Sequence, residues 1–455
     1  MYILITKSNI LFINNQNDDN MKNIVIIGAG PAGRFAAMDA AEKSNNVTLI
    51  EKRHIGGKCL NQACMVVCAL SDVSKHVVES KNFNDLNLIE SEVKVNYANI
   101  ADKIKETQKK IRHVITKETT GTGVDYVRGE ATVDAERKVV IVDDEDEYPY
   151  DKLLICTGSS PLLPDIKGVE NAYTYKDTLK IKQIPEKLVI IGGGSTAAEY
   201  ANIFSSFGSQ VDILCRSSFL KMLGDSEAEE YIVSNLLKNT IVHENVEIQE
   251  ITDRSVITNY GEIEGTVLLA TGVVANSDIV KDIVDTDEKG NIIVDKHMQT
   301  SHPDIYAAGD VIGGLLSTPV SRMEGMVAIN NIMGNDVEAD YSLIPLTVTL
   351  NYDVSYMKGD SVNNNGKELT LPGAAGPGSF WNMLGGKTGM TKENIDIESG
   401  KINNVLAITP SSNIALPYMV KIMKDKKDSD FSNFLEIHPT TDGIFKLAQY
   451  SKRYA

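Results

Sequence analysis

The chain contains only five cysteines among its 455 residues, too few for the disulfide-rich scaffold of a small secreted protein. This usage favours a reducing cytoplasm, where a pair of cysteines is more often catalytic than structural. The chain also lacks any apolar run of roughly 18 residues or more, the length that a transmembrane helix needs. We therefore expect a cytoplasmic protein with no membrane span.

The chain also has fewer basic than acidic residues. Lysines and arginines number 45 against 62 aspartates and glutamates, which gives a formal net charge of −17. No basic stripe stands out that could neutralise phosphates, so nucleic-acid binding is not expected. The most basic stretch, Lys103 to Arg112, is interrupted by Glu106 and predicts a solvated helix face. The composition, 42% hydrophobic and 24% charged, is typical of a soluble globular protein.

The first twenty residues lack a basic start and a small-residue cleavage site, so a signal peptide is not expected. A polar run from Asn14 to Asn20 precedes Met21, which leads directly into apolar residues. We expect residues 1–20 to be an N-terminal extension that is disordered or that stems from a misplaced start codon. The length of the chain predicts roughly three domains of about 150 residues each.

A glycine motif follows the first apolar segment. Ile24–Ile27 predicts a buried strand, and Gly28, Gly30 and Gly33 come directly after it at the spacing of a dinucleotide-binding turn. Glycines there let the backbone approach a pyrophosphate at the start of a helix. Glu51 ends the next predicted strand, where an acid accepts hydrogen bonds from a ribose.

The same pattern occurs a second time. Leu188–Ile191 predicts a strand that leads into Gly192, Gly194 and Ala197, and Val211–Leu214 supplies the next strand. Two such units on one chain imply two bound nucleotides, one of which passes electrons to the other.

A pair of cysteines lies close behind the first motif. Cys59 and Cys64 are separated by four residues and follow Gly56-Gly57-Lys58, so they can close a small redox disulfide. A chance spacing is the weaker alternative. A metal site is not expected, because no second cysteine pair or nearby histidine completes four ligands. The other buried-looking cysteines, Cys156 and Cys215, are interpreted as small hydrophobic residues at strand ends.

The remaining segments complete a modular chain. Two apolar strands end in Thr157-Gly158 and Thr271-Gly272, where the chain can pass from one domain to the next. Residues 72–118 predict two helices, and residues 126–142 alternate in the manner of antiparallel strands. We expect one nucleotide-binding domain over 21–157 and 271–340, a second one over 158–270, and a third domain over 341–455.

Together these motifs resemble the FAD-dependent pyridine nucleotide-disulfide oxidoreductases that use two cysteines, closest in appearance to dihydrolipoamide dehydrogenase, with this chain as a divergent member. The resemblance implies an α/β fold with two Rossmann-like dinucleotide-binding domains and a C-terminal α+β dimerisation domain. The first domain, 21–157 and 271–340, would bind FAD, the second, 158–270, would bind NAD(P), and residues 341–455 would form the dimerisation domain. It implies that FAD, reduced by NAD(P)H, passes electrons to a Cys59–Cys64 disulfide, which reduces a disulfide substrate. Cys64 would be the thiol on the flavin side, and Cys59 would attack the substrate.

The resemblance also assigns roles to single residues. His438, in His438-Pro439-Thr440, would be the acid/base that reaches the cysteines of the other subunit in a homodimer. The expected cofactor-binding residues, from both nucleotide sites, are Gly28, Gly30, Gly33, Glu51, Lys52, Gly57, Thr157, Gly158, Gly192, Gly194, Ala197, Glu199, Arg216, Gly272 and Asp310. Asp310, at the end of a predicted strand, would bind the ribityl-phosphate side of FAD.

Several positions depart from the family pattern. Cys68 stands where the family has a lysine that pairs with the residue matching Glu199. An unpaired buried carboxylate tends to take up a proton, so the flavin environment should differ. Cys68 either fills the space of the lysine or acts as a third thiol. Gly443 replaces the glutamate that orients the family histidine, with Asp442 beside it as a substitute, and Val273 stands in place of an arginine.

The nicotinamide and the substrate are partly indicated. The second motif has Cys215 and then Arg216 at the position where the first has Glu51, and a base there favours the 2′-phosphate of NADPH over NADH. Met38 and Asp39 replace the arginine pair of glutathione reductases, which leaves a lipoyl-like or other small disulfide. Two alternatives stay open: a flavoprotein reductase of a quinone, oxygen or an electron-transfer protein, and a non-turnover FAD-binding subunit of a larger complex.

Overall fold

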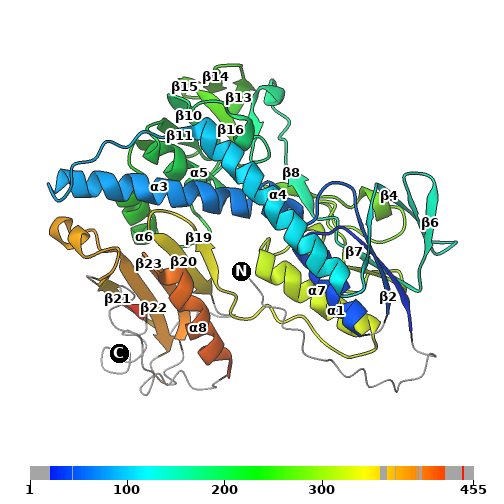
Figure 1. Ribbon diagram of the computed structural model, residues 1–455. Helices are drawn as coiled ribbons and strands as arrows, with labels where there is room; N and C mark the ends of the chain where they lie inside the picture. The colour runs from blue at the N-terminus through cyan, green and yellow to red at the C-terminus, as the bar shows by residue number, and fades with distance from the viewer. Residues whose placement is uncertain are drawn as a thin grey trace.

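The protein divides into three bodies, each built on its own sheet. A computed structural model describes residues 21–43, 45–358, 366–374, 376–396, 398, 402–425 and 443–444. In Figure 1 the sheet that contains β2 (Asn46–Glu51) lies at the right, and the one with β10 (Lys187–Ile191) lies at the top. The sheet with β20 (Asp353–Lys358) lies at the lower left.

The first sheet is parallel, with strand order β18-β7-β1-β2-β3. Its other strands are β1 (Asn23–Ile27), β3 (Asp125–Arg128), β7 (Lys152–Ile155) and β18 (Ile305–Ala307). Nearly every side chain of β1 and β7 is buried, as expected for a sheet covered on both faces. Because the strands are parallel, their carboxyl ends lie at one edge of the sheet, where the glycine motif begins.

Helices from distant parts of the sequence cover this sheet. They are α1 (Pro31–Glu42), α4 (Tyr97–Gly121) and α7 (Thr318–Ile332), and α1 packs directly on α7. Small residues make that packing close: a Cβ on Gly325 would lie 2.6 Å from the carbonyl oxygen of Ala32. The return of β18 and α7 to this sheet agrees with a first domain made of two segments, although its exact boundaries stay a prediction.

The second sheet is also parallel, with order β12-β11-β10-β16-β9. Its other strands are β9 (Tyr173–Thr174), β11 (Gln210–Leu214), β12 (Thr240–His243) and β16 (Thr266–Leu269), and it is flanked by α5 (Ser195–Ser206), α6 (Ser226–Tyr231) and a π-helical turn, η4 (Ile232–Leu236). The first two sheets are joined by β8 (Ser159–Pro161) and β17 (Val273–Ala275), which pair antiparallel. These strands follow the two Thr-Gly dipeptides, so the chain passes between the first and the second body twice, on two adjacent strands.

The antiparallel expectation for residues 126–142 is correct only in part. β4 (Ala131–Asp134), β5 (Val139–Val142) and β6 (Asp146–Pro149) do form an antiparallel sheet. β3, however, pairs parallel with β2 at the edge of the first sheet. The reason is that α4 precedes β3 as a crossover helix, and a strand that follows a crossover returns in the parallel direction. Another small antiparallel sheet contains β13 (Ile248–Ile251), β14 (Ser255–Thr258) and β15 (Gly261–Glu264).

The third body is an antiparallel sheet with a helix against it. Its strand order is β19-β20-β23-β22-β21, and α8 (Ser412–Asp425) packs on β20 and β23. The remaining strands are β19 (Leu346–Val348), β21 (Gly366–Pro372), β22 (Met390–Asp396) and β23 (Ile402–Thr409). Two Rossmann-like parallel sheets and a C-terminal α+β body confirm the predicted α/β fold class.

Two helices connect the first glycine motif to the rest of the protein. They are α2 (Gly57–Asn61) and the long α3 (Cys64–Asp85), and α3 packs against α5 of the second body. The predicted pair of helices over 72–118 corresponds to α3 and α4. Short 3-10 turns occur at η2 (Val169–Asn171), η3 (Thr178–Lys180), η5 (Asp278–Val280), η6 (Asp310–Ile312) and η7 (Trp381–Gly385).

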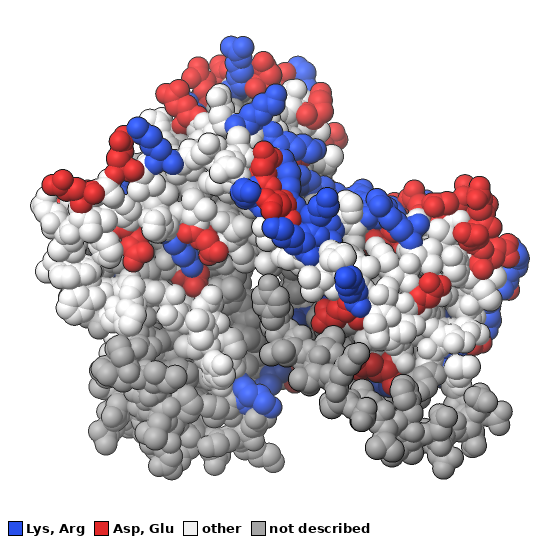
Figure 2. Space-filling view, in the orientation of Figure 1, with Lys and Arg blue, Asp and Glu red and all other residues white. Residues whose placement is uncertain are grey.

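Charge is spread unevenly over this surface. Figure 2 shows lysines and arginines gathered over α4, whereas acidic side chains dominate the end of the molecule at β6. Three lysines of α4 have partners within the helix, because Glu106 pairs with Lys103 and Lys110, and Asp102 pairs with Lys105. Among the described residues, no helix combines the length and the hydropathy that a membrane crossing requires.

Candidate active site

The first glycine motif forms a tight turn between β1 and α1. Gly28 has a φ of +107°, and a Cβ there would lie 2.2 Å from the carbonyl oxygen of Cys156. Gly30 is the N-cap of α1, and no side chain caps the helix. Gly33 packs so closely that its Cβ would lie 2.0 Å from the carbonyl oxygen of Gly28. The free N–H groups of this helix start fit a pyrophosphate, which they can bind directly.

Glu51 lies at the carboxyl end of β2, beside that turn. Its Oε2 accepts a hydrogen bond from the N–H of Ala29 at 2.9 Å, and its Oε1 accepts one from the N–H of Arg53 at 2.8 Å. Each carboxylate oxygen can accept a further bond, so ribose hydroxyls remain possible donors. Lys52, also predicted to bind cofactor, pairs instead with Glu130 at 3.1 Å.

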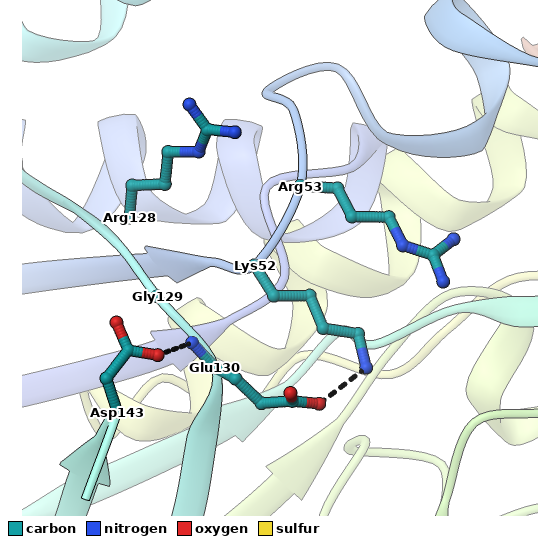
Figure 3. Close-up of a pocket in the computed structure, with 6 residues that line it drawn as sticks. All are labelled: Lys52, Arg53, Arg128, Gly129, Glu130 and Asp143. Carbon is teal, nitrogen blue, oxygen red and sulfur yellow. Dashed lines mark hydrogen bonds and ion pairs between the residues drawn. The ribbon is translucent and has the colours of Figure 1, made fainter.

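A cavity of about 530 Å³ opens beside Glu51, at the ends of β2 and β3 (Figure 3). Its lining residues are Lys52, Arg53, Arg128, Gly129, Glu130 and Asp143. In Figure 3 the side chains of Arg53 and Arg128 point away from each other, and Lys52 and Glu130 meet between the strands.

The second glycine motif repeats the geometry of the first. Gly192 has a φ of +138°, and a Cβ on it would lie 2.2 Å from the carbonyl oxygen of Ala270. Gly194 is the uncapped N-cap of α5 and has open space around it, while Ala197 is fully buried beneath. Arg216 follows β11 at the same edge and is exposed. A second dinucleotide therefore fits here as well.

Cys59 and Cys64 lie together, in α2 and at the first turn of α3. Their thiols are hydrogen-bonded to each other. The hydroxyl of Thr318, at the start of α7, donates to the Sγ of Cys59 at 3.3 Å and lies 3.8 Å from the Sγ of Cys64. α2, α3 and α7 thus converge on one pair of thiols.

The two thiols have opposite acidities. Donation by the thiol of Cys64 lowers the pKa of Cys59 to about 7, and the hydroxyl of Thr318 and the charge of Arg322 act in the same direction. The same hydrogen bond raises the pKa of Cys64. The first proton therefore leaves the pair near neutral pH, which is the condition for thiol–disulfide exchange.

Glu199 lies on α5, close to the cysteines. Its Oε1 accepts a hydrogen bond from the N–H of Thr349 at 3.1 Å, and among the described residues it has no lysine or arginine partner. Burial raises the pKa of this carboxyl to about 7, and the neighbouring Cys64 and Asp353 add to the shift. Lys75 does not reach Glu199, because it is engaged with Asp353 at 3.0 Å.

Asp310 lies just beyond β18, at the same sheet edge as the first turn. Its Oδ2 accepts hydrogen bonds from the hydroxyl of Ser159, at 2.8 Å, and from the ammonium of Lys58. The first Thr-Gly dipeptide is hydrogen-bonded to the segment after the second. The hydroxyl of Thr157 donates to the carbonyl of Asn276, and the N–H of Asn276 donates to the carbonyl of Gly158.

The other predicted site residues fall into two groups. Some contact the strands or the glycine turn described above, and others lie outside the described part of the chain. Gly272 accepts a hydrogen bond from the N–H of Leu162, and Gly57 packs against Gly30. His438 and Asp442 lie outside the described residues, so their relation to the cysteines stays a prediction. Within the described residues, no group of three histidines, cysteines or carboxylates could hold a metal ion.

Two contributors were not anticipated from the sequence. Thr318 contacts both sulfurs, and Lys58 contacts Asp310. A signal for the first was present, because Ser317-Thr318-Pro319 is the kind of sequence that begins a helix. Nothing in the sequence indicated that this helix would start beneath the cysteines, 254 residues away from Cys64.

Cys156 and Cys215 behave as the sequence predicted. Both are buried, and burial raises the pKa of each, to about 12 for Cys215. Cys68 is different, because it is exposed and its electrostatic neighbours include Cys64 and Glu199.

Known proteins share this arrangement. The chain is 29% identical over 435 residues to an uncharacterised protein of Methanocaldococcus jannaschii, covering 93% of this chain and 96% of the relative. It is 31% identical to dihydrolipoyl dehydrogenase of Staphylococcus aureus, covering 70% and 72%. The fold matches the HOCl-induced flavoprotein disulfide reductase RclA from Escherichia coli with a TM-score of 0.80 and 22% identity, covering 93% of this chain and 98% of the other.

The family comparison covers both glycine motifs and the cysteine pair. The description "Pyridine nucleotide-disulphide oxidoreductase" matches residues 22–325, about two thirds of the chain. With its two nucleotide folds and its pair of adjoining thiols, the chain belongs to the pyridine nucleotide-disulphide oxidoreductase family.

Proposed function

We propose that the protein is an FAD-dependent NAD(P)H:disulfide oxidoreductase that works through Cys59 and Cys64 on a small disulfide, of which a lipoyl-like group is the leading candidate. The observation that carries the proposal is the pair itself. Two thiols lie in hydrogen-bond contact between the two nucleotide folds, and the pKa of one of them is lowered to about 7. The relatives named dihydrolipoyl dehydrogenase support the choice of substrate class.

The residues divide the work as follows. When bound, FAD supplies two-electron transfer between a reduced nicotinamide and the cysteine pair. The Cys59–Cys64 disulfide takes up two electrons and one proton and becomes the Cys59 thiolate and the Cys64 thiol. The thiolate of Cys59 attacks the substrate disulfide and releases one thiol; Cys64 then attacks Cys59, releases the second thiol and restores the disulfide. Thr318 holds the sulfurs together and donates to the thiolate.

NADPH is the proposed electron donor. Arg216 is exposed at the end of β11, where it has no carboxylate partner among the described ion pairs. A free guanidinium in that position suits a 2′-phosphate. In Arg216→Glu, kcat/KM for NADPH should fall roughly tenfold or more while that for NADH changes little, because only NADPH carries the extra phosphate. Arg254→Glu, an exposed arginine on another hairpin, is the control.

We propose that two copies associate through the C-terminal body, so that each could supply His438 to its partner. Large apolar side chains are exposed there, with Trp381 at 43%, Leu384 at 73% and Tyr418 at 64% exposure. Exposed apolar clusters of this size are typical of protein interfaces. The compartment that suits such a dithiol enzyme is a reducing cytoplasm.

The decisive experiment is an anaerobic titration of the purified protein with NADPH and with NADH, recorded by absorbance. A long-wavelength charge-transfer band between thiolate and flavin after two electrons would support the proposal. Direct bleaching of the flavin without that band, unchanged in Cys64→Ser, would favour a reductase of a quinone, oxygen or an electron-transfer protein. Absence of any reduction would favour the non-turnover FAD-binding subunit.

A further inference from the structure

Positive charge converges behind the first glycine turn, from segments far apart in the sequence. Lys52 and Arg53 follow β2, Lys58 lies in α2, and Lys176 follows β9. Lys176 is partly buried, and its pKa is lowered first by that burial and then by the charges of Arg53, Lys58 and Lys52. Four cations held this close repel one another, so the cluster is costly unless an anion joins it.

The carboxylates nearby do not balance the cluster. Asp310 is engaged with Lys58, and Glu130 with Lys52. Asp177 is closer to Lys180, which it contacts at 2.6 Å. Among the described ion pairs, Arg53 and Lys176 have no carboxylate partner; the Nζ of Lys176 has only the hydroxyl of Ser160 at 3.4 Å. Two positive charges therefore remain available to a ligand.

A buried hydroxyl points to the same ligand. Tyr175 is 9% exposed, and its hydroxyl has no hydrogen-bond partner among the described residues. The Nζ of Lys58 lies 5.9 Å from the centre of its ring, and Asp310 and Arg53 are among its electrostatic neighbours. A buried hydroxyl without a partner costs free energy, which a ligand oxygen would recover.

Lys58 connects the cluster to the glycine turn. It follows Gly57, whose backbone lies so close to the turn that a Cβ on it would be 2.7 Å from the Cα of Gly30. Its ammonium donates to Asp310 and, at 2.6 Å, to the hydroxyl of Ser159. An ammonium has three donors, so one is left for a further acceptor.

Resting on the function proposed above, we propose that Lys58, Lys176 and Arg53, together with the hydroxyl of Tyr175, bind the diphosphate of FAD at the first glycine turn. The uncapped start of α1 supplies N–H groups from one side, and the cations supply charge from the other.

The test measures FAD binding by the apoprotein and needs no turnover. Flavin fluorescence gives the dissociation constant for the wild type, for Lys176→Met, Lys58→Met and Tyr175→Phe, and for the control Lys180→Met, at low and high KCl. Each of the first two substitutions should weaken FAD binding by about tenfold or more, because each removes a charge-assisted hydrogen bond. Tyr175→Phe should weaken it severalfold, and the control should match the wild type.

Inorganic pyrophosphate serves as a second probe. It should compete with FAD for the wild-type apoprotein and compete less well for Lys176→Met. Added KCl should weaken FAD binding more in the wild type than in Lys176→Met or Lys58→Met. Circular dichroism checks that each variant is folded.

Several outcomes would overturn the proposal. If Lys176→Met binds FAD as tightly as Lys180→Met, Lys176 does not bind the diphosphate. If only Lys58→Met loses affinity, Lys58 acts through its pair with Asp310 and the cluster is not a diphosphate site. If the wild-type apoprotein binds no FAD, the proposed function itself is wrong, which is a different result from equal binding by all variants.

Discussion

Three thiols and one carboxyl lie close together at the centre of this protein. Cys59 and Cys64 share a hydrogen bond that separates their acidities, and Thr318 contacts both sulfurs. Cys68 lies one helical turn after Cys64, on the side of Glu199. A lysine at position 68 would neutralise Glu199, whereas a cysteine leaves its carboxyl with a pKa of about 7.

The acidity of Cys59 should depend on Cys64. In Cys64→Ala the donor to the Cys59 thiolate is lost, so the pKa of Cys59 should rise from about 7 toward its ordinary value. At pH 7 its alkylation by iodoacetamide should slow by roughly tenfold, because about tenfold less thiolate is present. Mass spectrometry of the Cys59 peptide over a pH series measures this rate. Cys68→Ala is the control, and an unchanged midpoint in Cys64→Ala would contradict the assignment.

Glu199 should carry a proton below neutral pH. An acid whose pKa rises on folding binds its proton more tightly in the folded state, so its ionisation costs stability as the pH rises from about 4.5 to about 7. Infrared difference spectroscopy should detect a protonated carboxyl at pH 6 that disappears by pH 8 and is absent in Glu199→Gln.

A lysine at position 68 should reverse this behaviour. In Cys68→Lys the pKa of Glu199 should fall below about 5, because an opposite charge nearby favours the carboxylate. The protonated signal would then be absent at pH 6. In Cys68→Ser, which adds no charge, the signal of the protonated Glu199 carboxyl should remain at pH 6. Its loss in that variant would show that the substitution had changed the burial of Glu199 and not the charge beside it.

Helices α1 and α5 both begin at a glycine without a capping side chain. Such a start leaves backbone donors free, which costs stability unless a ligand or water accepts from them. That both nucleotide folds do this at the carboxyl end of a central strand is the strongest structural sign that both bind anionic groups. α2 then leads from the first turn to the cysteines: it spans five residues, Gly57–Asn61, and contains Cys59.

The approach of α2 to the first turn should be sensitive to a single methyl group. Gly57 has a φ of +56°, and in Gly57→Ala the new Cβ would lie 2.7 Å from the Cα of Gly30. The substitution should cost about 1–3 kcal/mol and lower the first thermal unfolding midpoint by several degrees, as calorimetry would measure. In Gly121→Ala, where no atom lies within 4 Å of the new Cβ, the midpoint should not fall. Equal midpoints for the two variants would show that the approach is looser.

For the protein in its entirety, the arrangement of the three bodies brings remote segments together at one place. α3 lies between the first nucleotide fold and α5 of the second, and β19 and β20 of the third body approach Glu199 through Thr349 and Asp353. Several exposed apolar residues lie on that third body, among them Trp381 and Leu384 in η7 and Tyr418 in α8. A second copy seated there would complete the site with the proposed histidine.

The proposed dimer has a direct test. The wild type should have twice the chain mass of 49.7 kDa in sedimentation equilibrium. Leu384→Glu and Trp381→Glu should each raise the dimer dissociation constant by about 30-fold or more, because central apolar side chains contribute about 2 kcal/mol or more to such interfaces. Leu163→Glu, at an exposed leucine outside the C-terminal body, should leave the dimer intact. A monomeric wild type would exclude the dimer.

Much of this protein follows from local sequence. The glycine spacings, the strands before them and the acid after the first one specify two nucleotide turns, because only glycine tolerates those backbone angles and close approaches. The four-residue gap between Cys59 and Cys64 likewise specifies a thiol pair. These are short-range constraints, legible within about thirty residues of chain.

Other features depended on contacts between distant segments. Packing of segments far apart in sequence brings the hydroxyl of Thr318 to the cysteines and the charge of Lys176 near that of Lys58. It also makes β3 pair in parallel with β2. The pKa of Glu199 depends on how completely α3 and β19 remove it from water, which no local pattern reveals. The sequence alone therefore identifies the cysteine pair and the glycine turns. The pKa values of the thiols and the charged groups around the turns depend on tertiary packing, since burial and charge act through space.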